Sequence, residues 1–282
     1  MRTIWITGAG GLIGSYLART APRFVPPARV VALARGTLDL ANSTAVRSEF
    51  YRQKPELIVH CAGMSQSPEC QANPTLARKL NVEVTALLAE LAVEARLIFL
   101  STDLVFDGRT GNYDESAVPN PLNIYAETKV EAERMVLANP NHTVVRTSLN
   151  GGISPTGDRG FNERFYNAWR EGKLLSLFAD EYRSPICAEV TAHAIWELAS
   201  QGKPGLYHVA GSERLSRWQI GELLAARHPE LKPRIERSSL KEYSGAPRSP
   251  DTSLNCGKLQ SLLSFPLPRF TAWLGANPSK PF

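Results

Sequence analysis

Cysteine, histidine and long apolar runs are scarce in this sequence, and each scarcity excludes a class of protein. The four cysteines are scattered, with no Cys-x-x-Cys pair and no histidine at metal-ligand spacing, which favours free thiols over a zinc site or a disulfide framework. No apolar run approaches the roughly 20 residues that a helix needs to cross a bilayer, and the N-terminus "MRTIWITGAGG" lacks the architecture of a signal peptide. We therefore expect a soluble, cytoplasmic protein that binds no metal and no membrane.

Basic residues are in modest excess but are not gathered into a patch. The net charge is +5, and the densest basic stretch, residues 234–248, has glutamates between its basic residues and no regularly spaced aromatics. This pattern is typical of a solvated face rather than of a nucleic-acid platform. We expect no nucleic acid as a partner, and an anionic small molecule fits the charge better.

Short aliphatic runs alternate with helix-like segments over the first half of the chain. In the longest expected helix, apolar residues recur at helical spacing from Leu76 to Leu91, as a face that packs on a sheet requires. Alternating helices and continuous apolar strands imply a doubly wound α/β fold with a parallel sheet. The expected strands are residues 2–7, 29–34, 56–60, 96–101 and 142–147, and the expected helices are 11–20, 42–53, 74–95 and 123–138.

The rhythm changes after residue 148. Residues 150–160 are rich in glycine and polar side chains and predict a long loop, whereas 188–200 and 205–211 supply one more helix and strand that could rejoin the sheet. The proline-rich remainder suggests short helices joined by ordered loops. We expect a dinucleotide-binding Rossmann domain and a smaller substrate-binding lobe, with boundaries at 1–149 (rejoined by about 187–211) and at 150–186 plus 212–282.

A glycine-rich segment, "TGAGGLIG" (7–14), follows the first expected strand and opens the first helix. Gly8, Gly11 and Gly14 would serve a tight turn, a close backbone approach to a pyrophosphate and close helix–strand packing. The position between strand and helix is the context that such a motif requires. It predicts dinucleotide binding.

The second expected strand ends in "ALARG", with Arg35 and no acid. A carboxylate at this place would bind the ribose hydroxyls of NAD, whereas an arginine can pair with the 2′-phosphate of NADP. The alternative is an arginine solvated in a loop. We expect NADP(H), with NAD(H) as the second choice. Asp39 is placed either to meet the adenine or to cap the next helix.

A tyrosine and a lysine lie four positions apart in "YAETK" (125–129), within an expected helix that Asn123 can cap. Residues at i and i+4 share a helix face, so Tyr125 and Lys129 form either a catalytic pair or part of a solvated surface. A nearby cation favours a phenolate, which otherwise forms only near pH 10. The pattern alone leaves both interpretations open.

Together these segments resemble the extended short-chain dehydrogenase/reductases, and among them the dTDP-4-dehydrorhamnose reductase branch. The resemblance covers nearly the whole chain, and the segments occur in the family's order. They include the glycine loop, "LDL" (38–40), "CAG" (61–63), "STDLVFDG" (101–108), "NPLNIYAETKVEAE" (120–133), "RTS" (146–148), "DEYRSPICAEVTAHAI" (180–195) and "GLYHVAGSERLSRWQIGELL" (205–224).

The resemblance implies roles for individual residues. Tyr125 would be the general acid/base, Lys129 would lower its pKa and bind the nicotinamide ribose, and Thr102 would polarise the carbonyl. The remaining implied cofactor contacts are Gly8, Gly11, Leu12, Ile13, Gly14, Arg35, Asp39, Leu40, Cys61, Ala62 and Gly63. The expected substrate contacts are Thr102, Asp103, Leu104, Leu149, Arg183 and Arg248.

The chain departs from the branch's usual pattern on the substrate side. Leu104 stands for an aromatic residue, Leu149 for a tryptophan and Arg183 for a glycine, and "MSQSPECQANP" (64–74) replaces an acidic, tyrosine-containing loop. The leucines are either packing substitutions or a sign of another substrate. Arg183 either meets a substrate diphosphate or pairs with Asp180 or Glu181 on the surface. These departures put the rhamnose precursor itself in doubt.

The implied activity is NADPH-dependent reduction of a keto-sugar that is nucleotide-linked, by a monomer or homodimer. One alternative is a sugar-nucleotide epimerase or dehydratase, for which Asp103 would supply half of the acid–base pair beside Thr102. Another is a non-catalytic subunit, because the branch also resembles the regulatory subunit of methionine adenosyltransferase, which binds the dinucleotide but acts through a partner protein.

Overall fold

The computed structural model describes residues 2–278 and 280, and its centre is a six-stranded parallel sheet. The order across the sheet is β2-β1-β3-β4-β5-β10, so the chain reverses its direction of travel between β1 and β3. This confirms the doubly wound fold. The strands are β1 (Arg2–Thr7), β2 (Ala28–Leu33), β3 (Leu57–His60), β4 (Arg96–Thr102), β5 (Thr143–Thr147) and β10 (Gly205–Val209).

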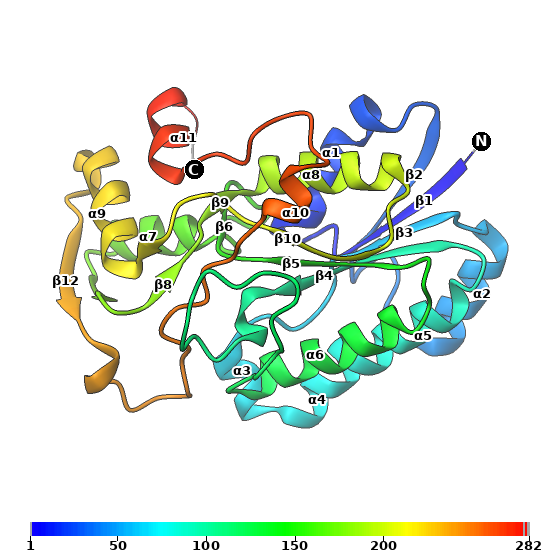
Figure 1. Cartoon of the computed structure of the whole chain (residues 1–282), viewed down its shortest axis with the longest axis horizontal. Helices are drawn as coiled ribbons and strands as arrows, with labels where there is room; N and C mark the ends of the chain where they lie inside the picture. The colour runs from blue at the N-terminus through cyan, green and yellow to red at the C-terminus, as the bar shows by residue number, and fades with distance from the viewer. Residues whose placement is uncertain (1, 279, 281–282) are drawn as a thin grey trace.

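Helices cover both faces of this sheet, as Figure 1 shows. Side chains alternate along a strand, so Ile4 and Ile6 of β1 face α1 (Leu12–Phe24) and α8 (Ala188–Gln201). Trp5 faces the opposite layer of α2 (Ser43–Gln53), α5 (Val84–Leu91) and α6 (Ile124–Leu137). The carboxyl ends of the strands remain free of this cover, which is where the site lies.

The helix expected over 74–95 is interrupted. It consists of α4 (Pro74–Arg78), a π-helical turn (Lys79–Glu83) and α5, and a further short helix, α3 (Ser67–Ala72), precedes it. A π turn carries extra residues per turn and rotates the helix face, so Leu76, expected to pack on the sheet, is 46% exposed. That expectation was wrong.

A second group of elements forms a lobe at one end of the molecule (Figure 1). Its core joins α7 (Phe161–Arg170), α9 (Arg217–Arg227) and α11 (Phe270–Ala276) to the paired strands β7 (Leu174–Phe178) and β12 (Arg234–Ser238). The sequence reading did not expect β12, because its residues are mostly charged and exposed; pairing with β7 makes it a strand.

Smaller elements connect the lobe with the sheet. Two short strand pairs, β6 with β9 and β11 with β8, lie between them. β10 rejoins the sheet beside β5, as residues 205–211 predicted. The assignment of the lobe to substrate binding stays a prediction. The bounds are β6 (Asn150–Gly151), β8 (Tyr182–Arg183), β9 (Ile186–Cys187), β11 (Leu215–Ser216) and α10 (Gly257–Gln260), with 3-10 turns at Asp103–Val105, Pro229–Leu231 and Leu240–Glu242.

The described part of the chain contains four free cysteines, as expected. Within residues 2–278 and 280, no helix has both the length and the apolar character that crossing a membrane requires. The same residues include no group of three or more His, Cys, Asp or Glu side chains able to hold a metal ion.

Candidate active site

A cavity of about 1010 Å³ opens at the carboxyl ends of the strands. In open α/β sheets ligands bind at this edge, where the strand order reverses. The cavity brings together every residue that the sequence singled out for a site. These are Gly8, Gly11, Leu12, Ile13, Gly14, Arg35, Asp39, Leu40, Cys61, Ala62, Gly63, Thr102, Asp103, Leu104, Tyr125, Lys129, Leu149, Arg183 and Arg248.

The glycine loop presents bare backbone to this cavity. Gly8 has a φ of +69°, and a Cβ there would lie 2.7 Å from the backbone nitrogen of Ala62, so only glycine fits. Gly11 caps α1 without a side-chain hydrogen bond, and the first turn holds no acidic residue. The N–H groups of Leu12 and Ile13 have no acceptor among the described residues. Free donors at a positive helix end fit the pyrophosphate of a dinucleotide.

Arg35 and Asp39 lie at the end of the cavity formed by β2. Arg35 is exposed, and its guanidinium has no hydrogen-bond or ion-pair partner within the described residues. Asp39 does not cap α2: its Oδ1 accepts from the Ala41 N–H, whereas Asn42 is the cap and accepts from the Ala45 N–H at 3.1 Å. A contact between Asp39 and the adenine stays a prediction.

Thr102, Tyr125 and Lys129 meet where β4 ends beside the start of α6. Asn123 caps α6 by accepting from the Ala126 N–H, which fixes the first turn and places Tyr125 in it. The Thr102 hydroxyl lies near the Tyr125 phenol and favours its ionised form. Burial has the larger effect and raises the pKa of Tyr125, so the phenol carries its proton at neutral pH.

Lys129 is buried and directed at β4. Its Nζ donates to the Leu100 carbonyl at 2.7 Å and lies 3.9 Å from the centre of the Phe99 ring. Burial lowers its pKa to about 8, and the Glu133 carboxylate opposes that shift. The ammonium is thus bonded to the strand, and the expected lowering of the Tyr125 pKa by Lys129 stays a prediction.

Asp103 anchors the wall of the cavity next to Thr102. Its carboxylate accepts from the hydroxyls of Thr102 (3.2 Å), Ser148 (2.7 Å) and Thr252 (2.9 Å), and the Nε atom of Arg183 lies 3.8 Å away. Burial raises the pKa of Asp103, and these partners oppose the shift. Asp103 therefore joins the ends of β4 and β5 to the C-terminal segment.

Arg183 and Arg248 share one carboxylate. Glu181 lies 2.9 Å from Nη2 of Arg183 and accepts from Arg248 at 2.7 and 2.9 Å. Arg183 also donates to the carbonyls of Tyr182 and Ser249. The pairing with Glu181 that the sequence left open is present, but Arg183 is 4% exposed and the pair is internal rather than on the surface. Substrate contact by either arginine stays a prediction.

Leu104 and Leu149, the two leucines that depart from the family's pattern on the substrate side, both line the cavity. Leu149 also packs against the core of the lobe, and the backbone N–H of Leu104 donates to the Thr102 hydroxyl at 3.2 Å. The loop that follows β3 contributes Met64, Ser65 and Gln66 to the same wall.

Sequence reasoning missed two arginines of the lobe. Arg164 of α7 and Arg217 of α9 line the cavity beside Arg248. Burial lowers the pKa of Arg217 to about 10, with Glu181 opposing the shift, and its guanidinium has no hydrogen-bond or ion-pair partner among the described residues. The cavity lining holds seven Arg or Lys residues against four Asp or Glu, an excess that suits an anion. No local pattern marks these arginines, because only tertiary packing brings them together.

Asn81 was missed as well, although a signal existed. It lies in the π-helical turn and lines the cavity. Its Oδ1 accepts from the Met64 N–H at 2.7 Å, and its Nδ2 donates to the Thr128 hydroxyl at 2.9 Å. Asn81 thus ties the loop after β3 to the turn of α6 that carries Tyr125 and Lys129. A buried asparagine within an apolar helix face was the available sign.

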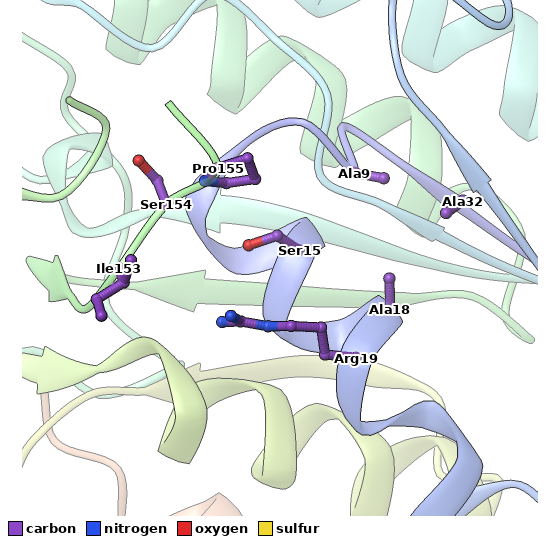
Figure 2. Close-up of a pocket in the computed structure, with 8 residues that line it drawn as sticks. All are labelled: Ala9, Ser15, Ala18, Arg19, Ala32, Ile153, Ser154 and Pro155. Atoms are coloured by element: carbon purple, nitrogen blue, oxygen red, sulfur yellow. The ribbon is translucent and has the colours of Figure 1, made fainter. Parts of the chain in front are cut away.

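A smaller cavity of about 460 Å³ lies on the other side of the glycine loop. Figure 2 shows it between α1 and the loop that carries Ile153 and Ser154. Its two hydroxyls are engaged, that of Ser15 with the Leu12 carbonyl and that of Ser154 with Glu163. We therefore place the site in the larger cavity.

Relatives of two kinds match the chain. Methionine adenosyltransferase 2 subunit beta of Xenopus laevis is 27% identical, and the match covers 93% of this chain and 82% of that protein. A dTDP-4-dehydrorhamnose reductase of Sinorhizobium fredii is 28% identical over 94% and 93%. No choice between the two follows from these identities alone.

Solved structures agree with the fold. A hypothetical dTDP-4-dehydrorhamnose reductase from Sulfolobus tokodaii is 30% identical, covers 95% of this chain and 96% of that one, and has a TM-score of 0.82. The dTDP-4-dehydrorhamnose reductase of Bacillus anthracis in complex with NADP has a TM-score of 0.88 at 24% identity, over 98% of both chains. The family model described as the RmlD substrate binding domain matches residues 1–277. The chain accordingly belongs to this family of extended short-chain dehydrogenase/reductases.

Proposed function

We propose that this protein is an NADPH-dependent reductase of a keto-sugar that is linked to a nucleotide. The observation that carries the proposal is the placement of Thr102, Tyr125 and Lys129 in one cavity with the uncapped N-terminus of α1. A dinucleotide at the helix end and a carbonyl at the tyrosine would then lie at the same edge of the sheet.

The chain's own groups suit the protonation half of a carbonyl reduction. The bound nicotinamide would supply the hydride. Tyr125 holds its proton at neutral pH because burial raises its pKa, so it can donate that proton to the developing alkoxide. Thr102 can hold the same oxygen, since its hydroxyl already meets the phenol. Hydrogen bonds aimed at a developing charge in a buried site are a major source of rate enhancement.

NADP(H) is the proposed cofactor, with NAD(H) second. Support comes from the unpartnered, exposed Arg35 at the end of β2 and from the absence of an acid at that strand end in the sequence. A relative of the same fold was solved in complex with NADP, while a neighbour with UDP-glucuronic acid was solved with NAD.

The nucleotide link of the substrate rests on the lobe's arginines. Arg164, Arg217 and Arg248 line the same end of the cavity, and Glu181 is the carboxylate that Arg248 and Arg183 share. A diphosphate would offer Arg217 the charged acceptors that the described residues do not, and arginine binds phosphate oxygens bidentately. We assign this end of the cavity to the diphosphate of the substrate.

A subunit that acts on a partner enzyme is the second candidate. The relatives named Methionine adenosyltransferase 2 subunit beta favour it, whereas the complete Thr102–Tyr125–Lys129 set favours catalysis. An epimerase or dehydratase is less favoured, because Asp103 is already held by three hydroxyls and Leu104 supplies no acid or base.

The decisive experiment follows NADPH oxidation with dTDP-, UDP- and GDP-linked 4-keto sugars. Tyr125→Phe is the matched variant, since it removes one oxygen and keeps the ring. We expect turnover by the parent and none by the variant, with equal NADPH binding by both. Tight co-purification with a larger enzyme, together with no turnover of any keto-sugar, would support the subunit instead.

A further inference from the structure

A buried carboxylate lies directly behind the proposed catalytic residues. Tyr125, Lys129 and Glu133 follow one another at four-residue steps along α6 and share its sheet-facing side. Glu133 is 3% exposed and does not line the cavity, so it cannot touch a ligand. Any effect it has on the site must pass through other residues.

The Glu133 carboxylate is fixed from two strands. Ser101, which precedes Thr102 in β4, donates to it at 2.5 Å, and Arg146 of β5 donates through Nε at 3.0 Å and Nη2 at 2.6 Å. Lys129 is bonded to the Leu100 carbonyl, one residue before Ser101. Glu133 and Lys129 therefore hold adjacent residues of β4 immediately before Thr102.

Glu133 is also the negative charge that acts on Lys129. The other titratable groups that face the ammonium are Cys61 after β3, Cys70 of α3 and His60 of β3. Burial raises the pKa of the two thiols to about 12 and about 11 and lowers that of His60 to about 3, so all three are neutral near pH 7. Among the described residues that face Lys129, this leaves Glu133 as the group that favours its charged form.

Arg146 competes for the same carboxylate. It is 3% exposed, and its Nη1 has no hydrogen-bond partner among the described residues. One buried carboxylate thus pairs with Arg146 and also attracts the charge of Lys129, one helical turn away on α6. Removing its charge would leave both cations in a poorly solvating interior, where an uncompensated charge is strongly disfavoured.

We propose that Glu133 is a positioning residue that keeps Lys129 charged and holds the end of β4, and so Thr102, in register with α6. The role of Lys129 in this statement rests on the proposed function. The contacts of Glu133 do not, and the test can be made without cofactor or substrate.

The experiment is a pH titration of Lys129 by NMR in the full-length, lysine-labelled protein, with its signal identified by loss in Lys129→Met. Glu133→Gln keeps the shape and an acceptor for Ser101 but removes the charge. We expect the Lys129 midpoint to fall by about one to three pH units, the usual effect of a close opposite charge. Glu127→Gln, an exposed glutamate of the same helix, is the control and should leave the midpoint unchanged.

A second readout and a second variant keep the outcomes distinct. NADPH binding by Glu133→Gln should weaken about fivefold or more at pH 8 if the midpoint falls from about 8 by at least one unit, because the charged fraction of Lys129 then drops from about one half to about one tenth or less. If Glu133→Gln does not fold, Arg146→Gln tests the same carboxylate. Because this variant removes the competing cation, the Lys129 midpoint should rise rather than fall. An unchanged midpoint in the folded variant would overturn the inference. A parent protein that does not bind NADPH would refute the proposed function. The Lys129 titration would still decide whether Glu133 is a positioning residue.

Discussion

Replacement of Arg35 by glutamine tests the cofactor half of the site most directly. Arg35 is exposed and has no hydrogen-bond or ion-pair partner within the described residues, so the substitution removes no contact of the folded chain. Its effect on ligand binding can therefore be read without a correction for stability. The substitution should lower the affinity for NADPH and not that for NADH, because the 2′-phosphate is the group that distinguishes the two cofactors.

The size of the effect follows from the exposure of the side chain. A hydrogen bond to a charged group contributes about 1.5–3 kcal/mol, and exposure to solvent places Arg35 at the lower end because water and salt screen the charges. A loss of about 1.5 kcal/mol is roughly tenfold in affinity. The NADPH preference of the parent should also shrink as salt is raised.

Calorimetric titrations with NADPH and NADH would measure both affinities. Arg29→Gln is the matched control, since Arg29 is exposed on β2, the strand that precedes Arg35, but does not line the cavity. We expect weaker NADPH binding only in Arg35→Gln and unchanged NADH binding in both variants. Equal affinity of the parent for the two cofactors, or an equal loss for both in Arg35→Gln, would refute the reasoning.

Three further outcomes are expected. Arg217→Gln should weaken binding of a nucleoside diphosphate about tenfold, whereas Arg237→Gln, an exposed arginine outside the cavity, should not; fluorescence titration measures both. His60 has its pKa lowered to about 3 by burial, so the unfolded chain binds a proton that the folded chain excludes. The free energy of unfolding should therefore fall as pH drops below about 6.5, by up to ~1.4 kcal/mol per pH unit. In urea unfolding, His60→Gln should lack this part of the pH dependence. Leu104→Tyr should raise turnover of dTDP-4-dehydrorhamnose, measured as kcat/KM, because a phenol restores a hydrogen-bonding edge to the cavity wall; turnover that stays equal to the parent's would make Leu104 a packing residue only.

The parts of the fold that sequence could predict are those set by local patterns. Buried parallel strands are continuous apolar runs, and each predicted strand of the sheet lies within a residue or two of its observed bounds. The site followed from the strands, because residues just after parallel strands must meet at one edge of the sheet. Thr102 and Gly8 therefore line the same cavity although they are far apart in sequence.

The parts that failed depend on contacts that no window of sequence contains. β12 is a strand only because β7 pairs with it, and its charged residues give no strand pattern. Leu76 was placed on the sheet by a regular helical period, which the π turn breaks. Arg164 and Arg217 come from two helices that meet in the lobe, so their common cavity is a property of the tertiary structure.

The two ends of the cavity, one at β2 and one at the lobe, also bear on the choice between enzyme and subunit. A protein that only binds a dinucleotide needs the glycine loop and the end of β2, but not a desolvated arginine some distance away on α9. Burial lowers the pKa of Arg217 to about 10, and Glu181, which opposes this shift, forms its own hydrogen bonds and ion pairs with Arg183 and Arg248. Arg183, by contrast, is fully engaged by Glu181 and backbone carbonyls. An anionic ligand at the lobe end of the cavity would favour the charged form of Arg217 further, so the arrangement favours a protein that binds a substrate beside its cofactor.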